Sequence, residues 1–316
     1  MNKNLSTHTK DFLQLLGVLL VLMSFAAILS KGVFLSPINL FNITIQNIIL
    51  MIAALGQLLI IISGGIDLSV GSIVGFSSVF FVLLQDMASP VAYIILLVAI
   101  IIIGCINGAL VTCIKLPAFV VTMAMGYIVF SIAKIIGGGA SVYVGKNGGE
   151  ISATVMSLYK SQFLGIPYAL LIAVLCIIGV SLYIRTSMGH FIYTIGGNQK
   201  TAFLSGVPVV RVKIAVYIFA AILASIAGIM FVGRVGLGDP QAGDLLTLDS
   251  IAAVTVGGAS LSGGVGTVAG TVMGVLILGV LNNILNLLNV PPSIQPAIKG
   301  SIILLAVFLN SRKNRS

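Results

Sequence analysis

The feature of this sequence that most restricts its fold is a long apolar stretch without a charged side chain. No Asp, Glu, Lys or Arg occurs between Lys31 and Asp67, and other apolar segments follow along the chain. Charged residues make up 7% of the sequence and hydrophobic residues 59%, whereas a soluble domain has roughly 25% and 45–50%. Because about 20 apolar residues span a bilayer as a helix, we predict an all-α integral membrane protein.

The apolar segments predict about ten transmembrane helices in a single domain over residues 1–316. The third and eighth are short and are interrupted by glycine, so re-entrant segments are the alternative for these two. A re-entrant segment has to be buried in protein or line a water-filled cavity, because its backbone cannot face lipid. The predicted spans are residues 12–30, 45–63, 69–84, 91–113, 118–136, 167–184, 214–232, 249–255, 265–287 and 292–309.

The basic residues indicate the orientation, because cytoplasmic loops are enriched in Lys and Arg. The net charge of +9 would suggest nucleic acid as the partner of a soluble protein. Here the basic residues lie mostly between apolar segments, so we expect a lipid bilayer and no nucleic acid. With both termini in the cytoplasm, Lys115 and the basic connection 185–213 also lie there, and the acidic connection 233–249 lies outside.

A single carboxylate, Asp67, interrupts the apolar sequence next to several glycines. An ionisable residue in a membrane segment is a functional hypothesis by default, and a short polar turn between two helices is the alternative. A second interruption resembles the first, since GGIDLS at 64–69 matches GGASLS at 257–262. Interrupted helices at corresponding places in two halves of a chain indicate the substrate pathway of a transporter.

The sequence lacks the residue patterns of the common catalytic and metal sites. It contains no GxxxxGK[ST] phosphate-binding loop. Its two histidines, His8 and His190, lie in the N-terminal tail and the basic connection, away from the apolar serines that would need a base. Cys105, Cys113 and Cys176 have no metal-binding spacing. We therefore predict a protein that is not an enzyme, with no catalytic residue, no metal and no cofactor.

The connection 185–213 is too long for a simple turn between two spans. Asn198 can cap a helix that runs to Leu204, and Gly206 can end it. We predict a short cytoplasmic helix here. A solvated loop that merely follows the charge bias is the alternative.

Several motifs together resemble the permease subunits of bacterial monosaccharide ABC importers, the group for ribose, xylose, galactose and autoinducer-2. They cover nearly the whole chain in family order. Two positions depart from the family pattern, Thr247 where an acid is usual and Ile132-Ala133 where Arg-Gly is frequent. The motifs are GGIDLSVG at 64–71, NG at 107–108, LPAFVVT at 116–122, GGN at 196–198, LDSIAAV at 248–254 and GGASLSGG at 257–264.

The resemblance implies a type II importer permease that forms a homodimer in the bacterial cytoplasmic (inner) membrane. Its partners would be a cytoplasmic two-cassette ATPase, which binds the ATP, and an external sugar-binding protein. It also implies that the short helix couples to the ATPase through Gly196, Gly197, Asn198, Ala202, Ser205 and Gly206. The outer surface that receives the binding protein would include Lys146, Lys160, Arg234, Asp239 and Asp244.

The implied cargo is a monosaccharide, ribose or a similar pentose or hexose. Autoinducer-2 or another small polar solute is an alternative within the same family. A secondary sugar transporter driven by an ion gradient is an alternative outside it, although such a transporter would need several intramembrane acids.

A neutral sugar needs hydrogen-bonding groups rather than a fixed counter-ion, so we expect a weakly polar pathway. Asp67 has a second interpretation, in which it accepts backbone N–H bonds and holds the interruption together. For Lys299 we predict a side chain that snorkels outward, with pairing to Asp249 as the alternative. The candidate pathway residues are Asp67, Ser69, Asn47, Asn107, Thr122, Asn282 and Asn283.

Overall fold

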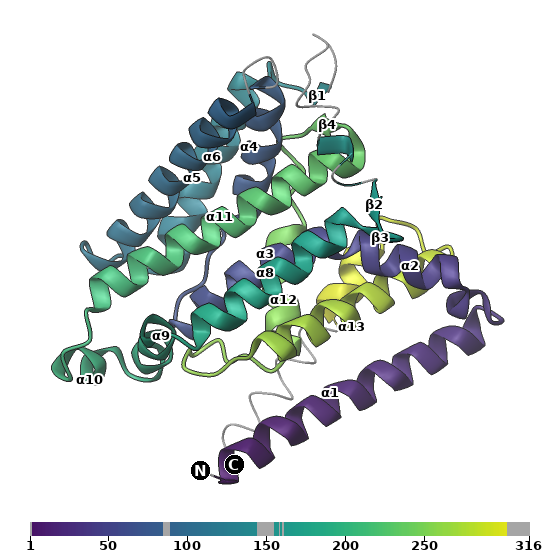
Figure 1. The fold of residues 1–316 in the computed structure, drawn as a ribbon, viewed down its shortest axis with the longest axis horizontal. Helices are drawn as coiled ribbons and strands as arrows, with labels where there is room; N and C mark the ends of the chain where they lie inside the picture. The colour runs from purple at the N-terminus through teal and green to yellow at the C-terminus, as the bar shows by residue number, and fades with distance from the viewer. Residues whose placement is uncertain (1, 85–88, 144–154, 158, 160, 302–316) are drawn as a thin grey trace.

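The computed structural model describes residues 2–84, 89–143, 155–157, 159 and 161–301, and helices dominate this part of the chain (Figure 1). The elements are α1 (Asn2–Leu29), η1 (Val33–Leu35), α2 (Pro37–Gln46), α3 (Ile48–Ile62), α4 (Val70–Leu83), α5 (Ser89–Thr112), α6 (Ala118–Ile136), β1 (Val142–Tyr143), β2 (Gln162–Phe163), β3 (Ile166–Pro167), α8 (Tyr168–Ile184), α9 (Ser187–Gly197), α10 (Gln199–Leu204), α11 (Val209–Val235), β4 (Leu237–Gly238), α12 (Leu246–Val256) and α13 (Val268–Leu287).

The predicted helical membrane fold is confirmed, but the count of about ten spans is not. Within the described residues, five helices are long and apolar enough to cross a membrane: α1 over Phe12–Leu29, α5, α6, α11 and α13. The pairs α2–α3 and α8–α9, bent by 41° and 73°, raise this number to seven if each pair forms one span. Helices α4 and α12 are shorter apolar helices. Residues 302–309 of the last predicted span, 292–309, lie outside the described residues.

Helix α3 forms the centre of the structure. Every residue from Ile48 to Ile62 is buried, as expected for a helix that is apolar on all sides. Helix α11 packs against α3, α4 and α5. Helices α12 and α13 pack against each other and against α3. Helix α1 lies along the edge of the molecule and contacts α13 (Figure 1). The segments on both sides of the Asp67 interruption are therefore held within protein.

Glycines four residues apart on one helix face allow other segments to approach closely. A Cβ added at Gly104 or Gly108 of α5 would lie 2.7 Å from the Cα of Ile218 or Ile214 of α11. Gly270 and Gly274 of α13 face backbone carbonyls at the end of α12 in the same way. These helix pairs thus depend on the absence of side chains at their contacts.

Gly71 and Gly75 of α4, which are also four residues apart, face a non-helical segment rather than another helix. Gly71 faces the backbone of Gly243, and Gly75 faces the carbonyl of Pro240. The connection between β4 and α12 therefore runs antiparallel alongside α4. Glycine spacing identifies a face that another backbone can approach, but it does not distinguish a helix from an extended segment.

The short strands and the α9–α10 unit occupy opposite ends of the bundle (Figure 1). Strand β1 pairs antiparallel with β4, which joins the connection after α6 to the end of α11. Strands β2 and β3 form a hairpin before α8. These pairs connect segments at the end that the charge pattern assigns to the outside.

Lys299 does not snorkel as we predicted, because its ammonium nitrogen lies 3.1 Å from a carboxylate oxygen of Asp249. The two side chains are 14% and 18% exposed. Asp249 stands in the first turn of α12, where a negative charge is also favoured by the helix dipole. The partly buried carboxylate of Asp249 therefore holds the Lys299 side chain against the protein.

We predict that Lys299→Met lowers the thermal stability of the protein in detergent, because Asp249 loses its partner. The double variant Lys299→Met/Asp249→Leu should recover most of the loss, since an apolar pair can replace a buried ion pair. A double-mutant cycle measured by thermal unfolding should give a coupling energy of about 1–3 kcal/mol. Additive effects of the two substitutions would show that the pair contributes no interaction energy.

Candidate functional site

The Asp67 interruption is held together by a buried hydrogen-bond network. Asp67 is 1% exposed, and its Oδ1 accepts bonds from the Ser69 amide at 2.7 Å and the Ser69 hydroxyl at 2.6 Å. The same hydroxyl accepts a bond from Nδ2 of Asn107 at 3.0 Å. Asn107 and Ser69, both predicted pathway residues, thus join α5 to the interruption. Asp67 accepts bonds from backbone and side chain, as its second interpretation predicts.

Two threonines satisfy backbone groups that the interruption leaves without helical partners. The Thr122 hydroxyl of α6 accepts a bond from the Leu68 amide at 2.9 Å. Thr247, at the start of α12, accepts one from the Gly71 amide at 3.0 Å. Ser69, the N-cap of α4, makes no side-chain capping bond, so Thr247 supplies the acceptor that the first turn of α4 needs. This is a structural role for a position that departs from the resembled family.

The two similar interruptions meet each other and the end of α9. The amide of Gly264 donates a bond of 2.9 Å to the carbonyl of Ile62, the last residue of α3. A Cβ at Gly196 would collide with that same carbonyl, and a Cβ at Gly263 would lie 2.9 Å from the Cα of Gly64. We call this contact of three backbones the glycine junction. It places the α9–α10 unit directly against both interruptions.

The predicted short helix in the basic connection is confirmed as α10. The Asn198 side chain accepts a bond from the Thr201 amide at 2.9 Å, and Gly206 follows the helix with φ +81°. Ala202 is buried, whereas Phe203 and Leu204 are 69% and 76% exposed. Helix α10 lies at the end of the bundle (Figure 1) and exposes these two large apolar side chains. Ser205 is the C-cap of α10.

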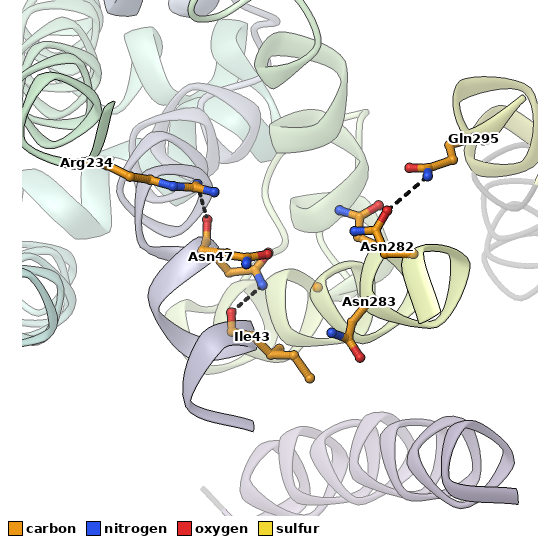
Figure 2. A pocket seen from close by; sticks show the side chains of 9 residues that line it. Ile43, Asn47, Arg234, Asn282, Asn283 and Gln295 are labelled. Atoms are coloured by element: carbon orange, nitrogen blue, oxygen red, sulfur yellow. Dashed lines mark hydrogen bonds between the residues drawn. The ribbon is translucent and has the colours of Figure 1, made fainter. Parts of the chain in front are cut away.

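The remaining predicted pathway residues lie at the other end of α3, in a second polar site. Asn47, Asn282 and Asn283 line a cavity of about 260 Å³ (Figure 2). Helix α3 has 15 residues, so this cavity is separated from the Asp67 network by roughly 22 Å along the helix axis. The structure therefore divides the candidate residues between two sites.

Within this cavity, the predicted asparagines differ in how their side chains are used. Asn283 exchanges two hydrogen bonds with Asn39 of α2, at 3.0 and 2.7 Å. Figure 2 shows it pointing away from Asn282. Asn47 is 9% exposed and donates to the Ile43 carbonyl at 2.6 Å. We name this site the amide cavity, because its lining includes Gln46, Asn47, Asn282, Asn283, Asn286 and Gln295, together with Ile43, Arg234 and Gly279.

Sequence reasoning missed several residues of both sites. Gln46, Asn286 and Gln295 carried no motif, and Arg234 was assigned only to the outer surface. The buried hydroxyl of Tyr217 lies beside the Asp67 network, 3.0 Å from the position of a Cβ at Gly65. Tyr217 lies inside an apolar span, so no local signal identified it. The only sequence feature that could have identified Tyr217 is its polar hydroxyl within a predicted span.

A second hollow, also of about 260 Å³, lies beside the interruption and is lined in part by Ser72, Tyr127, Asp244 and Thr247. Burial and then the Asp239 carboxylate raise the pKa of Asp244, and Lys134 partly opposes them. Of the predicted outer-surface residues, Asp239 and Asp244 thus lie close together, and Lys146 and Lys160 fall outside the described residues.

Comparison with known proteins finds transport permeases that match nearly the whole chain. Residues 39–307 match the family described as "Branched-chain amino acid transport system / permease component". The chain is 38% identical to the ribose import permease protein RbsC of Bacillus subtilis, covering 97% of this chain and 96% of that protein. It is 36% identical to RbsC of Escherichia coli K12 (93% and 92% covered) and 32% identical to the xylose transport system permease protein XylH of Haemophilus influenzae (100% of both). No solved structure matches the chain.

We predict that Asp67→Asn leaves the thermal stability close to that of the native protein, because the amide oxygen can replace Oδ1 as the acceptor for Ser69. Asp67→Ala removes that acceptor and should destabilise the protein by about 1–3 kcal/mol. Thermal unfolding in detergent compares the two variants. Equal losses in both would show that the negative charge, rather than the acceptor geometry, holds the interruption.

The glycine junction gives a second, independent prediction. Gly196→Ala should lower the thermal stability by about 1–3 kcal/mol, because the new methyl group overlaps the Ile62 carbonyl and the backbone must shift. Gly197→Ala is the matched control, since nothing lies within 4 Å of its Cβ position. Similar melting temperatures for the two variants would contradict the close contact of the three backbones.

Proposed function

This chain belongs to the family of transport-system permease components, and we propose that it is the membrane-spanning subunit of an ATP-driven importer whose cargo is ribose or a similar pentose or hexose. Its sugar-importer relatives, two named for ribose and one for xylose, are matched over nearly their whole length. These relatives are named as permeases, and the chain is accordingly a transport subunit rather than an enzyme. Autoinducer-2 or another small polar solute is the alternative cargo within this proposal.

The observation that carries the coupling to ATP is the glycine junction. An importer permease must transmit the state of an external ATPase to its own helices, and this requires a contact that differs between two conformations. Helix α10 exposes Phe203 and Leu204, and Gly196 lies at the end of α9, three residues before α10 begins. A movement of α10 would therefore act on both interruptions through a contact between backbones.

In this proposal a two-cassette ATPase binds ATP and docks on α10 from the cytoplasm, while an external sugar-binding protein docks near the short strands. Two copies of the chain enclose the pathway in the inner membrane, with both termini cytoplasmic. The charge pattern supports this orientation, because α10 lies in the basic connection 185–213. The Asp67 network and the amide cavity then lie toward the inner and outer sides, respectively.

The buried charges favour an ATP-driven importer over an ion-driven transporter. Among the described residues, Asp67 and Lys213 are the only charged side chains that are buried. Lys213 donates to Gln199 at 2.9 Å, next to α10, and Asp67 is bonded to Ser69. A proton-coupled transporter uses a relay of ionisable residues within the membrane, and the described part of α3 and its neighbours contains no such relay.

The proposal predicts that proteoliposomes holding this chain, the ATPase and the binding protein accumulate D-ribose or D-xylose only when ATP is present on the cytoplasmic side. Leu204→Glu should abolish this uptake and the co-purification of the ATPase, because a charge would replace an exposed apolar contact. It should leave the melting temperature unchanged, since Leu204 is 76% exposed.

Leu164→Glu is the matched control for co-purification. Leu164 is 87% exposed in the turn between β2 and β3, at the opposite end of the bundle, so this variant should bind the ATPase as the native chain does. Retention of the ATPase by Leu204→Glu would show that α10 is not the docking helix. Uptake by the chain alone, driven by an ion gradient without ATP, would replace the importer with a secondary transporter.

A further inference from the structure

The amide cavity is partly open and is lined mainly by uncharged polar side chains. It is bounded by the bend between α2 and α3, by the second half of α13, by Arg234 at the end of α11 and by Gln295 (Figure 2). Its volume of about 260 Å³ is slightly below the range of roughly 300–1,000 Å³ for sites that hold drug-sized ligands. Space of this size suits one small polar molecule.

Much of the hydrogen-bonding capacity of this cavity is not used within the protein. In the described part of the chain, the side chains of Gln46 and Asn282 form no hydrogen bond, and Oδ1 of Asn282 is buried without a partner. Arg234 has one long contact, 3.4 Å from Nη1 to the Gln46 carbonyl. Buried polar atoms are normally hydrogen-bonded. This rule applies to Oδ1 of Asn282, whereas Gln46 and Arg234 are exposed and can bond to solvent or to a ligand.

The fixed groups of the cavity hold the vacant ones in place. Asn47 donates to the Ile43 carbonyl, and Gly279 of α13 leaves the space that its amide occupies, because a Cβ there would collide with it. Gln295 donates to Oδ1 of Asn286 at 3.0 Å and to the Val290 carbonyl at 3.0 Å. The side-chain oxygen of Asn47 and the side-chain nitrogen of Asn286 are thereby left for a ligand.

We propose that the amide cavity binds one neutral monosaccharide after its release from the external binding protein. This proposal rests on the proposed function and assigns it a cargo site. Each sugar hydroxyl donates and accepts, and carboxamides do the same, so amides suit a polyol better than an ion. The lining contains no carboxylate, so a cation lacks a counter-charge. Arg234 supplies additional donors to hydroxyl oxygens.

Within this site, Asn282 contacts the sugar directly through its side-chain amide, which forms no hydrogen bond within the described part of the chain. Asn47 is held by α2 and α13 and presents its free oxygen from a fixed position. Asn283, whose amide is paired with Asn39, positions the second half of α13 against α2 and does not contact the sugar. The Asp67 network, at the other end of α3, is a separate element of the pathway.

The test uses a cysteine reporter in the permease–ATPase complex in nanodiscs, without the binding protein. Cys105, Cys113 and Cys176 are first replaced by Ala, because they include exposed thiols. Asn286→Cys then places a thiol at the exposed rim of the cavity, and Leu288→Cys places one outside the lining, at a residue that is 43% exposed. The rate of labelling by a charged thiol reagent is measured with D-ribose, D-xylose, sucrose or D-glucuronate.

We expect D-ribose or D-xylose to slow labelling at Asn286→Cys by about tenfold at ten times the Kd, since protection follows 1 + [L]/Kd. Labelling at Leu288→Cys should not change. Adding Asn282→Leu should raise the Kd roughly tenfold, as two lost hydrogen bonds would, so that protection at the same concentration falls to about twofold. Sucrose, which is too large for the cavity, should give no protection.

The outcomes separate this site from the importer function itself. If pentoses do not slow labelling while the complete importer still accumulates them with ATP, the cavity is not a cargo site and the proposed function stands. Protection by D-glucuronate alone would replace the polyol site with an anion site at Arg234. If the importer accumulates no pentose but D-ribose still protects Asn286→Cys, the cavity binds a sugar and the proposed transport function is wrong.

Discussion

The rest of the structure depends on satisfying the backbone where apolar helices are interrupted. Peptide groups in a membrane find no water, so an interruption is stable only if protein atoms take the place of the missing helical bonds. Here Asp67, Thr122 and Thr247 accept bonds from the amides after α3, and Ile62 accepts one from Gly264. Two of these acceptors come from α6 and α12, and the donor to Ile62 comes from the second interruption. The local conformation of one segment therefore requires the correct packing of several others.

This arrangement also explains why glycine is concentrated at the same places. At the glycine junction three backbones touch, and a side chain at Gly196 or Gly263 would separate them. Contacts between backbones leave little freedom for independent movement, so a displacement of α9 must be shared by both interruptions. A junction of this kind suits a protein whose cytoplasmic end has to be coupled to its interior, and it needs no buried ion pair to do so.

The two polar sites at the ends of α3 have different physical characters. The groups around Asp67 mostly bond to one another and to the backbone, although Oδ1 of Asn107 and the hydroxyl of Tyr217 are buried without a partner in the described part of the chain. Several side chains that line the amide cavity have unused donors and acceptors, as the proposed sugar site requires. Asn283 and Asn282 are neighbours in the sequence, yet one completes a contact with α2 and the other remains available, because successive residues of a helix point in different directions.

The sequence by itself determined the membrane class, most helix positions and the short helix α10, since hydrophobic length, glycine and capping residues act locally. Helix α6 coincides with its predicted span of 118–136. Only the tertiary structure decided that the span predicted at 45–63 belongs to a pair of helices bent beside Asn47, that Lys299 pairs with Asp249, and that the connection after β4 lies along α4. It also divided the predicted pathway residues between two sites. These features depend on contacts between residues that are distant in sequence, and the pattern within a single segment carries no information about which partner will meet it.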